Sequence, residues 1–242
     1  MSSEQTSNFS FKSFIKGLPL VGATAAKLTQ MPWVARARGK AFPGSERFWE
    51  GVYQKGETSG PGSYGRLAEF KAEVLNEFVA TNNIRTVIEF GCGDGAQLSL
   101  ARYPQYIGVD VATVSIARCS ARFAYDSSKR FYLAGKLPKD MGRSDLAMSL
   151  DVIYHLVEDD VFDAYMRRLF DHAKRFVVIY ASNYDALTSA AHVRHRKFTS
   201  WIENNARDWR QAEFVANRYP FDPERPDETS HADFHFFSRK NY

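Results

Sequence analysis

Three glycines and two acids have the spacing that most clearly points to chemistry. Gly91, Gly93 and Gly95 follow an apolar run, Glu89 lies just before them, and Asp110 ends a second apolar run. Glycines let a backbone turn sharply and approach a ligand that any Cβ would obstruct. A carboxylate at the end of the next strand can accept hydrogen bonds from two ribose hydroxyls, each worth roughly 1.5–3 kcal/mol. The pattern predicts a nucleotide site.

The glycine spacing also discriminates between nucleotides. Dinucleotide-binding turns usually have the pattern G-x-G-x-x-G, with the pyrophosphate over a helix N-terminus. Here the glycines alternate with other residues, and position 96 is Ala. Glu89, two residues before the first glycine, would repel a pyrophosphate and attract an amino group. The combination favours a nucleoside that carries a cationic amino acid.

In these residues the chain resembles the class I S-adenosylmethionine-dependent methyltransferases. Their first motif is an acid-x-Gly-x-Gly-x-Gly turn, and an acid ends their second strand. The resemblance covers residues 86–157 in detail and the rest of the chain to its C-terminus in outline. The alternative is a Rossmann-like domain that binds another nucleotide or none.

The resemblance implies S-adenosylmethionine as the cofactor. It implies that Glu89 and the glycine turn, in which Cys92 is a small residue that fits, contact the methionine part, and that Asp110 contacts the ribose. It implies Val111 and Leu133 near the adenine, and Leu150 or Asp151 near the sulfonium.

Apolar patterns alternate between strand-like and helix-like along the chain. The expected strands are 86–90, 106–110, 130–133, 145–150, 176–180, 213–217 and 233–237. The expected helices are 66–79, 113–123 and 159–172, with a helix-like aromatic stretch at 48–53 and a short helix after the glycine turn. This alternation predicts an α/β fold: a Rossmann-like, doubly wound, mostly parallel seven-stranded sheet with helices on both faces. Ligands should then lie at the carboxyl ends of the strands.

Length and composition fit one such domain plus an extension. The chain has 242 residues, of which 44% are hydrophobic and 25% charged. Its two cysteines cannot make a disulfide framework, so we expect a reducing compartment, the cytoplasm. No apolar run approaches the length of a membrane span. We expect a basic, apolar extension at 1–45 and the methyltransferase domain at 46–242.

The extension combines basic and apolar side chains. Its basic residues are Lys12, Lys16, Lys27, Arg36, Arg38 and Lys40, against the single acid Glu4. Such a composition suits a membrane surface or an acidic partner, so residues 9–40 could make a peripheral contact at the inner membrane face. The alternative is a tail that packs on its own domain or on a partner subunit. The sequence does not indicate an oligomeric state.

A base is expected just past the fourth predicted strand. An alcohol becomes a good nucleophile only when its proton is removed, so an O-methyltransferase benefits from a base near the hydroxyl. His155 is the first candidate because imidazole titrates near neutral pH. Asp151 could orient it or replace it. The alternative for His155 is a helix-capping or packing role.

A second cluster contains His192, Arg194, His195 and Arg196. It could bind the phosphate or carboxylate of a substrate, because arginine matches both groups. The alternative is a solvated basic helix start. Two histidine pairs have zinc-like spacing, but no cysteine or carboxylate accompanies them, so we expect no metal.

A finer resemblance suggests the acceptor. Residues 59–71 and 192–201 are similar to a group of bacterial methyltransferases associated with polysaccharide or glycolipid assembly. That resemblance implies a saccharide or glycolipid hydroxyl as acceptor, with Tyr64 and Arg66 in a lid over the cofactor.

The expected function is therefore methyl transfer from S-adenosylmethionine to an oxygen. One alternative is a small-molecule or natural-product methyltransferase. Another is a nucleic-acid methyltransferase that uses the basic tail, which is disfavoured because the fourth strand lacks an Asn/Asp-Pro-Pro-aromatic motif and no Pro-Cys pair is present. A non-catalytic cofactor-binding subunit is the third.

Overall fold

The computed structural model describes residues 42–138 and 140–240. Residues 42–242 form a compact unit of their own. The extension expected at 1–45 lies almost wholly outside the described residues, and so does its membrane contact through 9–40, so both remain predictions. Within the described ranges, no helix is long and apolar enough to cross a membrane.

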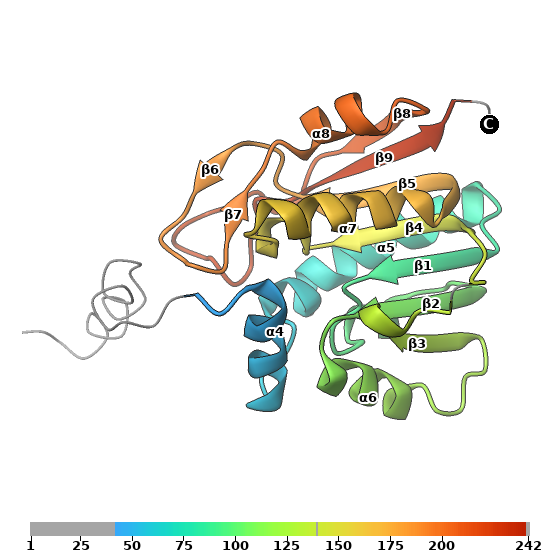
Figure 1. Cartoon of the computed structure of the whole chain (residues 1–242), viewed down its shortest axis with the longest axis horizontal. Helices are drawn as coiled ribbons and strands as arrows, with labels where there is room; N and C mark the ends of the chain where they lie inside the picture. The colour runs from blue at the N-terminus through green and yellow to red at the C-terminus, as the bar shows by residue number, and fades with distance from the viewer. Residues whose placement is uncertain (1–41, 139, 241–242) are drawn as a thin grey trace, which may run out of the picture. The chain divides into compact units, whose positions relative to one another are not determined.

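One seven-stranded sheet dominates the described part of the chain, in the order β3-β2-β1-β4-β5-β9-β8 (Figure 1). Its strands are β1 (Thr86–Phe90), β2 (Gln105–Asp110), β3 (Lys129–Leu133), β4 (Ser144–Leu150), β5 (Ala173–Ala181), β8 (Trp209–Val215) and β9 (Asp233–Arg239). The strands β3, β2, β1, β4 and β5 are parallel to one another, and β9 is antiparallel to both β5 and β8. The predicted mostly parallel sheet is confirmed.

Helices cover both faces of this sheet, as predicted. The helices on the faces are α5 (Gly65–Thr81), α6 (Thr113–Arg122), α7 (Asp159–Asp171) and α8 (Phe198–Asn205), and a further helix, α4 (Ser45–Gln54), contributes to the cavity described below. Side chains of α5 and α6 belong to one core cluster, and side chains of α7 and α8 belong to the other. Successive residues of a strand point to opposite faces. In β4, Leu146 and Met148 accordingly join the first cluster and Ala147 joins the second, which explains the continuous apolar run.

The chain reverses its direction across the sheet between β1 and β4. After β1 it builds outward through β2 and β3, and it then crosses back to place β4 on the other side of β1. In open α/β sheets, ligands bind in the crevice at the carboxyl ends of the strands beside such a switch. Short 3-10 turns surround this end: η2 (Pro61–Ser63), η3 (Gln97–Leu100), η4 (Ala134–Lys136) and η5 (Ile153–His155).

Some elements differ from the sequence-based expectation. The edge strand β8 begins at Trp209 rather than at 213, because most of its side chains are exposed and a bulge interrupts its pairing, which hides the alternation. The hairpin of β6 (Ala186–Leu187) and β7 (Arg194–His195) and the helix α8 were not predicted.

Candidate active site

A cavity of about 920 Å³ opens at the carboxyl ends of β1, β2 and β4. It brings together most of the residues that the sequence suggested: Glu89, Gly91, Cys92, Gly93, Asp110, Val111, Leu133, Leu150, Asp151, His155 and His192. The remaining suggested residues are not part of its lining: Tyr64, Arg66, Gly95, Arg194, His195 and Arg196.

Two side chains lie against the glycine turn that follows β1. Gly91 has φ +85°, and a Cβ added there would overlap Cγ2 of Val152. Gly93 has φ +56°, and a Cβ there would overlap Oγ of Ser59. Both positions therefore require glycine for backbone conformation and for space.

Asp110 closes the turn from β2. Its Oδ2 accepts a hydrogen bond from the Gly93 N–H and its Oδ1 accepts one from the Ala112 N–H, both at 2.9 Å. Burial raises the pKa of this carboxyl above its ordinary value, and the two N–H groups oppose that shift. Each oxygen keeps a further lone pair for a ligand hydroxyl, since an ionised carboxylate offers about four acceptor positions.

Two buried acceptors suit an amino group. Glu89 is 4% exposed, and its Oε2 accepts a hydrogen bond from the Tyr106 hydroxyl at 2.6 Å. Burial raises the pKa of Glu89 to about 7. Gln97 also lines the cavity, and its Oε1 has no hydrogen-bond partner among the described residues. A buried acceptor without a donor costs free energy, so Gln97 favours a ligand that brings an N–H group, and the Glu89 carboxylate can accept a further hydrogen bond beside it.

Asp151 is the centre of a partly buried polar group that joins three elements. Lys71 of α5 donates to its Oδ2 at 2.6 Å, and the Tyr154 hydroxyl donates to its Oδ1 at 2.8 Å. Asp151 has φ +59°, which is uncommon outside glycine. A Cβ on Gly62 would approach its Oδ2 to 3.0 Å, so the loop before α5 lies directly against it.

Sequence reasoning missed Lys71 and Tyr154. A signal for Lys71 was present: it lies four residues after Leu67 and four before Leu75, on the apolar stripe of the predicted helix. A lysine in such a stripe is either near an edge, with its ammonium in water, or paired with an acid in the interior. No comparable signal marked Tyr154.

His155 is fixed in one tautomer. Its Nδ1 lies 3.1 Å from the backbone carbonyl oxygen of His192. Because a carbonyl only accepts, Nδ1 carries the proton and Nε2 keeps its lone pair. Burial lowers the pKa of His155 to about 4, so the ring is neutral at pH 7. Trp49 packs edge-on against the ring, with 4.7 Å between centroids.

Hydrogen bonds attach helix α4 to two other segments of the domain. At the start of α4, Ser45 Oγ donates to Glu158 Oε2 at 2.6 Å. Further along α4, Glu50 accepts hydrogen bonds from the backbone N–H and the hydroxyl of Thr113, at the start of α6, at 2.7 and 2.9 Å. The helix thereby holds Trp49 in the cavity wall.

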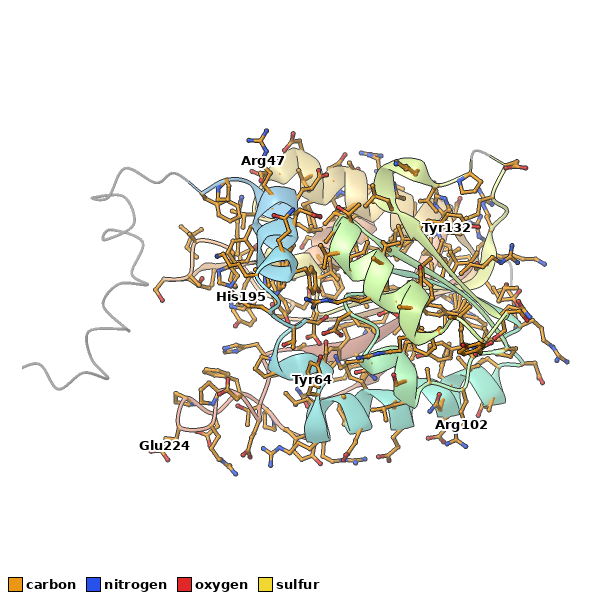
Figure 2. The ribbon with its side chains drawn as sticks, turned by 90° about the horizontal axis from the view of Figure 1, so that it is seen from below. Arg47, Tyr64, Arg102, Tyr132, His195 and Glu224 are labelled. Atoms are coloured by element: carbon orange, nitrogen blue, oxygen red, sulfur yellow. The ribbon has the colours of Figure 1, made fainter. Side chains whose placement is uncertain are left out.

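The expected lid residues lie beside the cavity rather than in its lining. Tyr64 lies just before α5 begins (Figure 2), and its hydroxyl donates to Asp94 Oδ2 at 2.6 Å. Since Asp94 belongs to the glycine turn, Tyr64 fastens the preceding loop to that turn. Arg66 instead donates to the backbone oxygen of Glu228 at 2.8 Å and stacks on Tyr219.

The basic cluster makes internal contacts. Arg196 is buried and donates to Asp159 Oδ1 at 2.6 Å and to the carbonyl oxygens of Leu156 and Val157. Arg194 shares the Asp159 carboxylate at 3.1 Å. These contacts fasten β7 to the segment after η5, and a substrate anion would have to compete with Asp159 for both guanidinium groups.

The remaining suggested residues are also packed. His195 Nδ1 lies 2.6 Å from Ser182 Oγ. A Cβ on Gly95 would approach Cys119 Sγ to 3.0 Å, below the turn. Among the described residues, no three potential metal ligands of the His, Cys, Asp or Glu type come together.

Comparison with known proteins shows the fold. No family model matches the chain, and no curated protein matches it. Magnesium protoporphyrin IX methyltransferase from Synechocystis PCC 6803, solved with S-adenosylmethionine bound, is 16% identical and has a TM-score of 0.59; the match covers 83% of this chain and 99% of that one.

Two further solved structures have a similar fold. The methyltransferase domain of a bacterial Hen1 is 21% identical with a TM-score of 0.55, over 70% of this chain and 96% of that one. The N-methyltransferase NodS from Bradyrhizobium japonicum WM9, solved with S-adenosylhomocysteine, is 17% identical with a TM-score of 0.54, over 72% of this chain and 87% of that one. The chain has the fold of the S-adenosylmethionine-dependent methyltransferases.

Proposed function

We propose that this protein transfers the methyl group of S-adenosylmethionine to an oxygen nucleophile, a hydroxyl of a saccharide or glycolipid. The observation that carries the proposal is the composition of one cavity, in which acceptors for an amino group, a carboxylate for a ribose and a neutral imidazole base occur together. The solved structures with this fold support the choice of cofactor, since two of them hold S-adenosylmethionine or its demethylated product.

The cavity residues fit each part of that cofactor. Glu89 and Oε1 of Gln97 would accept hydrogen bonds from the amino group. Asp110 would accept from the ribose hydroxyls, and the apolar side chains of Val111 and Leu133 would flank the adenine. When bound, S-adenosylmethionine supplies an electrophilic methyl group on a cationic sulfur.

His155 is the group that would accept the proton of the substrate hydroxyl. Its Nε2 keeps a lone pair because Nδ1 is committed to the His192 carbonyl. Its lowered pKa makes it a weak base that is always in its neutral form at pH 7, so it can accept a hydroxyl proton as the oxygen attacks. Positioning of the acceptor and exclusion of water supply the rest of the acceleration.

The charge of the cavity favours a neutral acceptor. Its acidic lining residues are Glu46, Glu89, Asp94, Asp110, Asp151 and Glu158, whereas its lysines and arginines are Arg47, Lys71 and Arg168. A phosphate-rich acceptor such as a nucleic acid would be repelled by this excess of acids. A sugar hydroxyl would not be. A lipid-linked sugar would also suit the membrane contact predicted for residues 9–40.

The test is calorimetric titration of the protein with S-adenosylmethionine and, separately, with NADH. We expect binding of the first alone. Asp110→Asn should weaken it by about 10-fold or more, since a charge-assisted hydrogen bond is worth about 1.5–3 kcal/mol. The exposed Asp126→Asn is the matched control and should leave affinity unchanged. Binding of NADH, or of neither ligand by the folded protein, would refute the proposal.

The acceptor needs a separate assay. Transfer of a radiolabelled methyl group to neutral saccharides and glycolipids should be detected, whereas RNA and DNA should remain unlabelled at any salt concentration. Labelling of nucleic acid that falls steeply with ionic strength would favour the nucleic-acid alternative instead.

A further inference from the structure

Lys71 is a buried cation whose role the proposed function leaves open. Of the three lysine and arginine side chains that line the cavity in the described part of the chain, Arg47 and Arg168 are exposed, whereas Lys71 is 1% exposed. A fully buried lysine is rare unless it is paired, because burying a charge is costly. Its partner is Asp151, with 2.6 Å between Nζ and Oδ2.

The ammonium of Lys71 has unused donors. An ammonium group carries three N–H bonds. Among the described residues, Asp151 provides the one hydrogen-bond acceptor of Lys71, and the Tyr180 ring lies 5.4 Å from Nζ. Lys71 lines the cavity, so the remaining N–H bonds are available to a bound anion.

Lys71 also lies near the acceptors that suit an amino group. Gln97 donates through Nε2 to the backbone oxygen of Ala68, which is one helical turn before Lys71 on α5. The charge of Lys71 acts on Glu89 as well and holds its pKa lower than burial alone would. Glu89 and Gln97 thus offer hydrogen-bond acceptors for an ammonium group, and Lys71 offers a cation for a carboxylate. Together they match an α-amino acid, a zwitterion that carries both groups on one carbon.

We propose that Lys71 binds the α-carboxylate of S-adenosylmethionine while it stays paired with Asp151, so that one buried cation is shared between the cofactor carboxylate and the Asp151 carboxylate. This inference rests on the proposed function. It makes Lys71 a positioning residue for Asp151 and a determinant of cofactor specificity. It also couples cofactor binding to the Lys71–Asp151 ion pair, because each carboxylate weakens the interaction of Lys71 with the other.

The coupling gives Lys71 and Asp151 opposite effects on the cofactor. Lys71→Met removes the cation that holds the carboxylate, so affinity for S-adenosylmethionine should fall. Asp151→Asn removes the competing carboxylate and its repulsion, so affinity should rise. Asparagine tolerates the positive φ of position 151, which makes this variant compatible with the backbone.

The experiment compares two probes by calorimetry on the full chain: S-adenosylmethionine, and decarboxylated S-adenosylmethionine, which keeps the amino group and the sulfonium. Lys71→Met should weaken binding of the first probe by about 10- to 100-fold, the value of one charge-assisted hydrogen bond. Decarboxylated S-adenosylmethionine should bind that variant at least as well as the wild type, because a positive charge near a cationic ligand has been removed. Asp151→Asn should tighten binding of the first probe and not of the second.

Two further variants separate recognition from folding. Lys71→Met leaves Asp151 buried without its partner, which can destabilise the fold. The double variant Lys71→Met with Asp151→Asn removes both charges, and it should melt near the wild-type temperature while still losing affinity for the carboxylate-bearing probe alone. Lys174→Met changes an exposed cation outside the cavity lining and should change neither affinity.

Equal losses for both probes in the folded double variant would overturn the inference, because Lys71 would then serve the fold only. A rise in affinity for both probes in Asp151→Asn would overturn the coupling. Failure of the proposed function has a different signature: the wild-type protein would bind neither probe.

Discussion

Replacement of Gly91 by alanine tests how tightly the cofactor turn is built. Gly91 has φ +85°, and its new Cβ would overlap Cγ2 of Val152. A non-glycine residue at such a φ costs about 1–3 kcal/mol. Overpacking of a filled site adds about 1–3 kcal/mol. Gly91→Ala should therefore lower the free energy of unfolding by about 2–6 kcal/mol, which for a chain of this size is a decrease in Tm of roughly 4–24 °C.

Urea and thermal unfolding followed by circular dichroism measure this effect, and two variants divide it. Gly91→Ala combined with Val152→Ala removes the overlap but not the backbone strain, so part of the loss should be recovered relative to Val152→Ala alone. Gly51→Ala is the control: it lies inside α4 with no atom within 4 Å of its added Cβ, and it should stabilise the protein by about 0.5–1 kcal/mol. A Gly91→Ala protein that melts within 2 °C of the wild type, on the order of 1 kcal/mol, would refute the reasoning.

Three other changes test titratable groups of the cavity and the arginines beside it. Because the pKa of Glu89 is raised to about 7 and a bound ammonium favours its ionised form, affinity for S-adenosylmethionine should fall as pH decreases from 7.5 to 5.5, by up to about tenfold per unit, and calorimetry on Glu89→Gln should show a flatter dependence. His155, with its pKa lowered to about 4, should leave kcat at saturating substrates constant over the same pH range, while His155→Ala should lower kcat by about 10²–10⁴-fold in a methyl-transfer assay. Arg196→Met should lower the free energy of unfolding by about 2–4 kcal/mol because two carbonyls and Asp159 lose their donor, whereas Arg194→Met, which is more exposed, should cost about 1 kcal/mol or less in the same urea titration. Equal costs for the two arginines would contradict the anchoring role of Arg196.

The cofactor half of the cavity could be predicted from sequence because its parts are local. The turn from Glu89 to Gly95 lies within one strand and one loop, and Asp110 follows at the end of the next strand. Parallel neighbouring strands bring such ends together without further information. Strand β1 accordingly has the bounds that its apolar pattern predicted.

Other contacts in and beside the cavity depend on residues far apart in the chain. Lys71 pairs with Asp151 across 80 residues, and Arg196 pairs with Asp159 across 37. A run of basic residues shows its charge but not its partners. The sequence therefore suggested a substrate anion for Arg194 and Arg196, whereas the structure places the carboxylate of Asp159 between them.

The place of Trp49 gives the protein a built-in optical signal. Among the described residues, Trp49 lines the cavity and packs against His155 and Tyr53, whereas Trp201 and Trp209 pack against Phe170 on the α7 side of the sheet. Indole emission depends on the polarity and quenching groups around the ring. A molecule that enters the cavity should thus alter the emission of Trp49 and leave that of Trp201 and Trp209 nearly constant. Fluorescence titration can then screen unlabelled saccharides as acceptors before any methylated product is known.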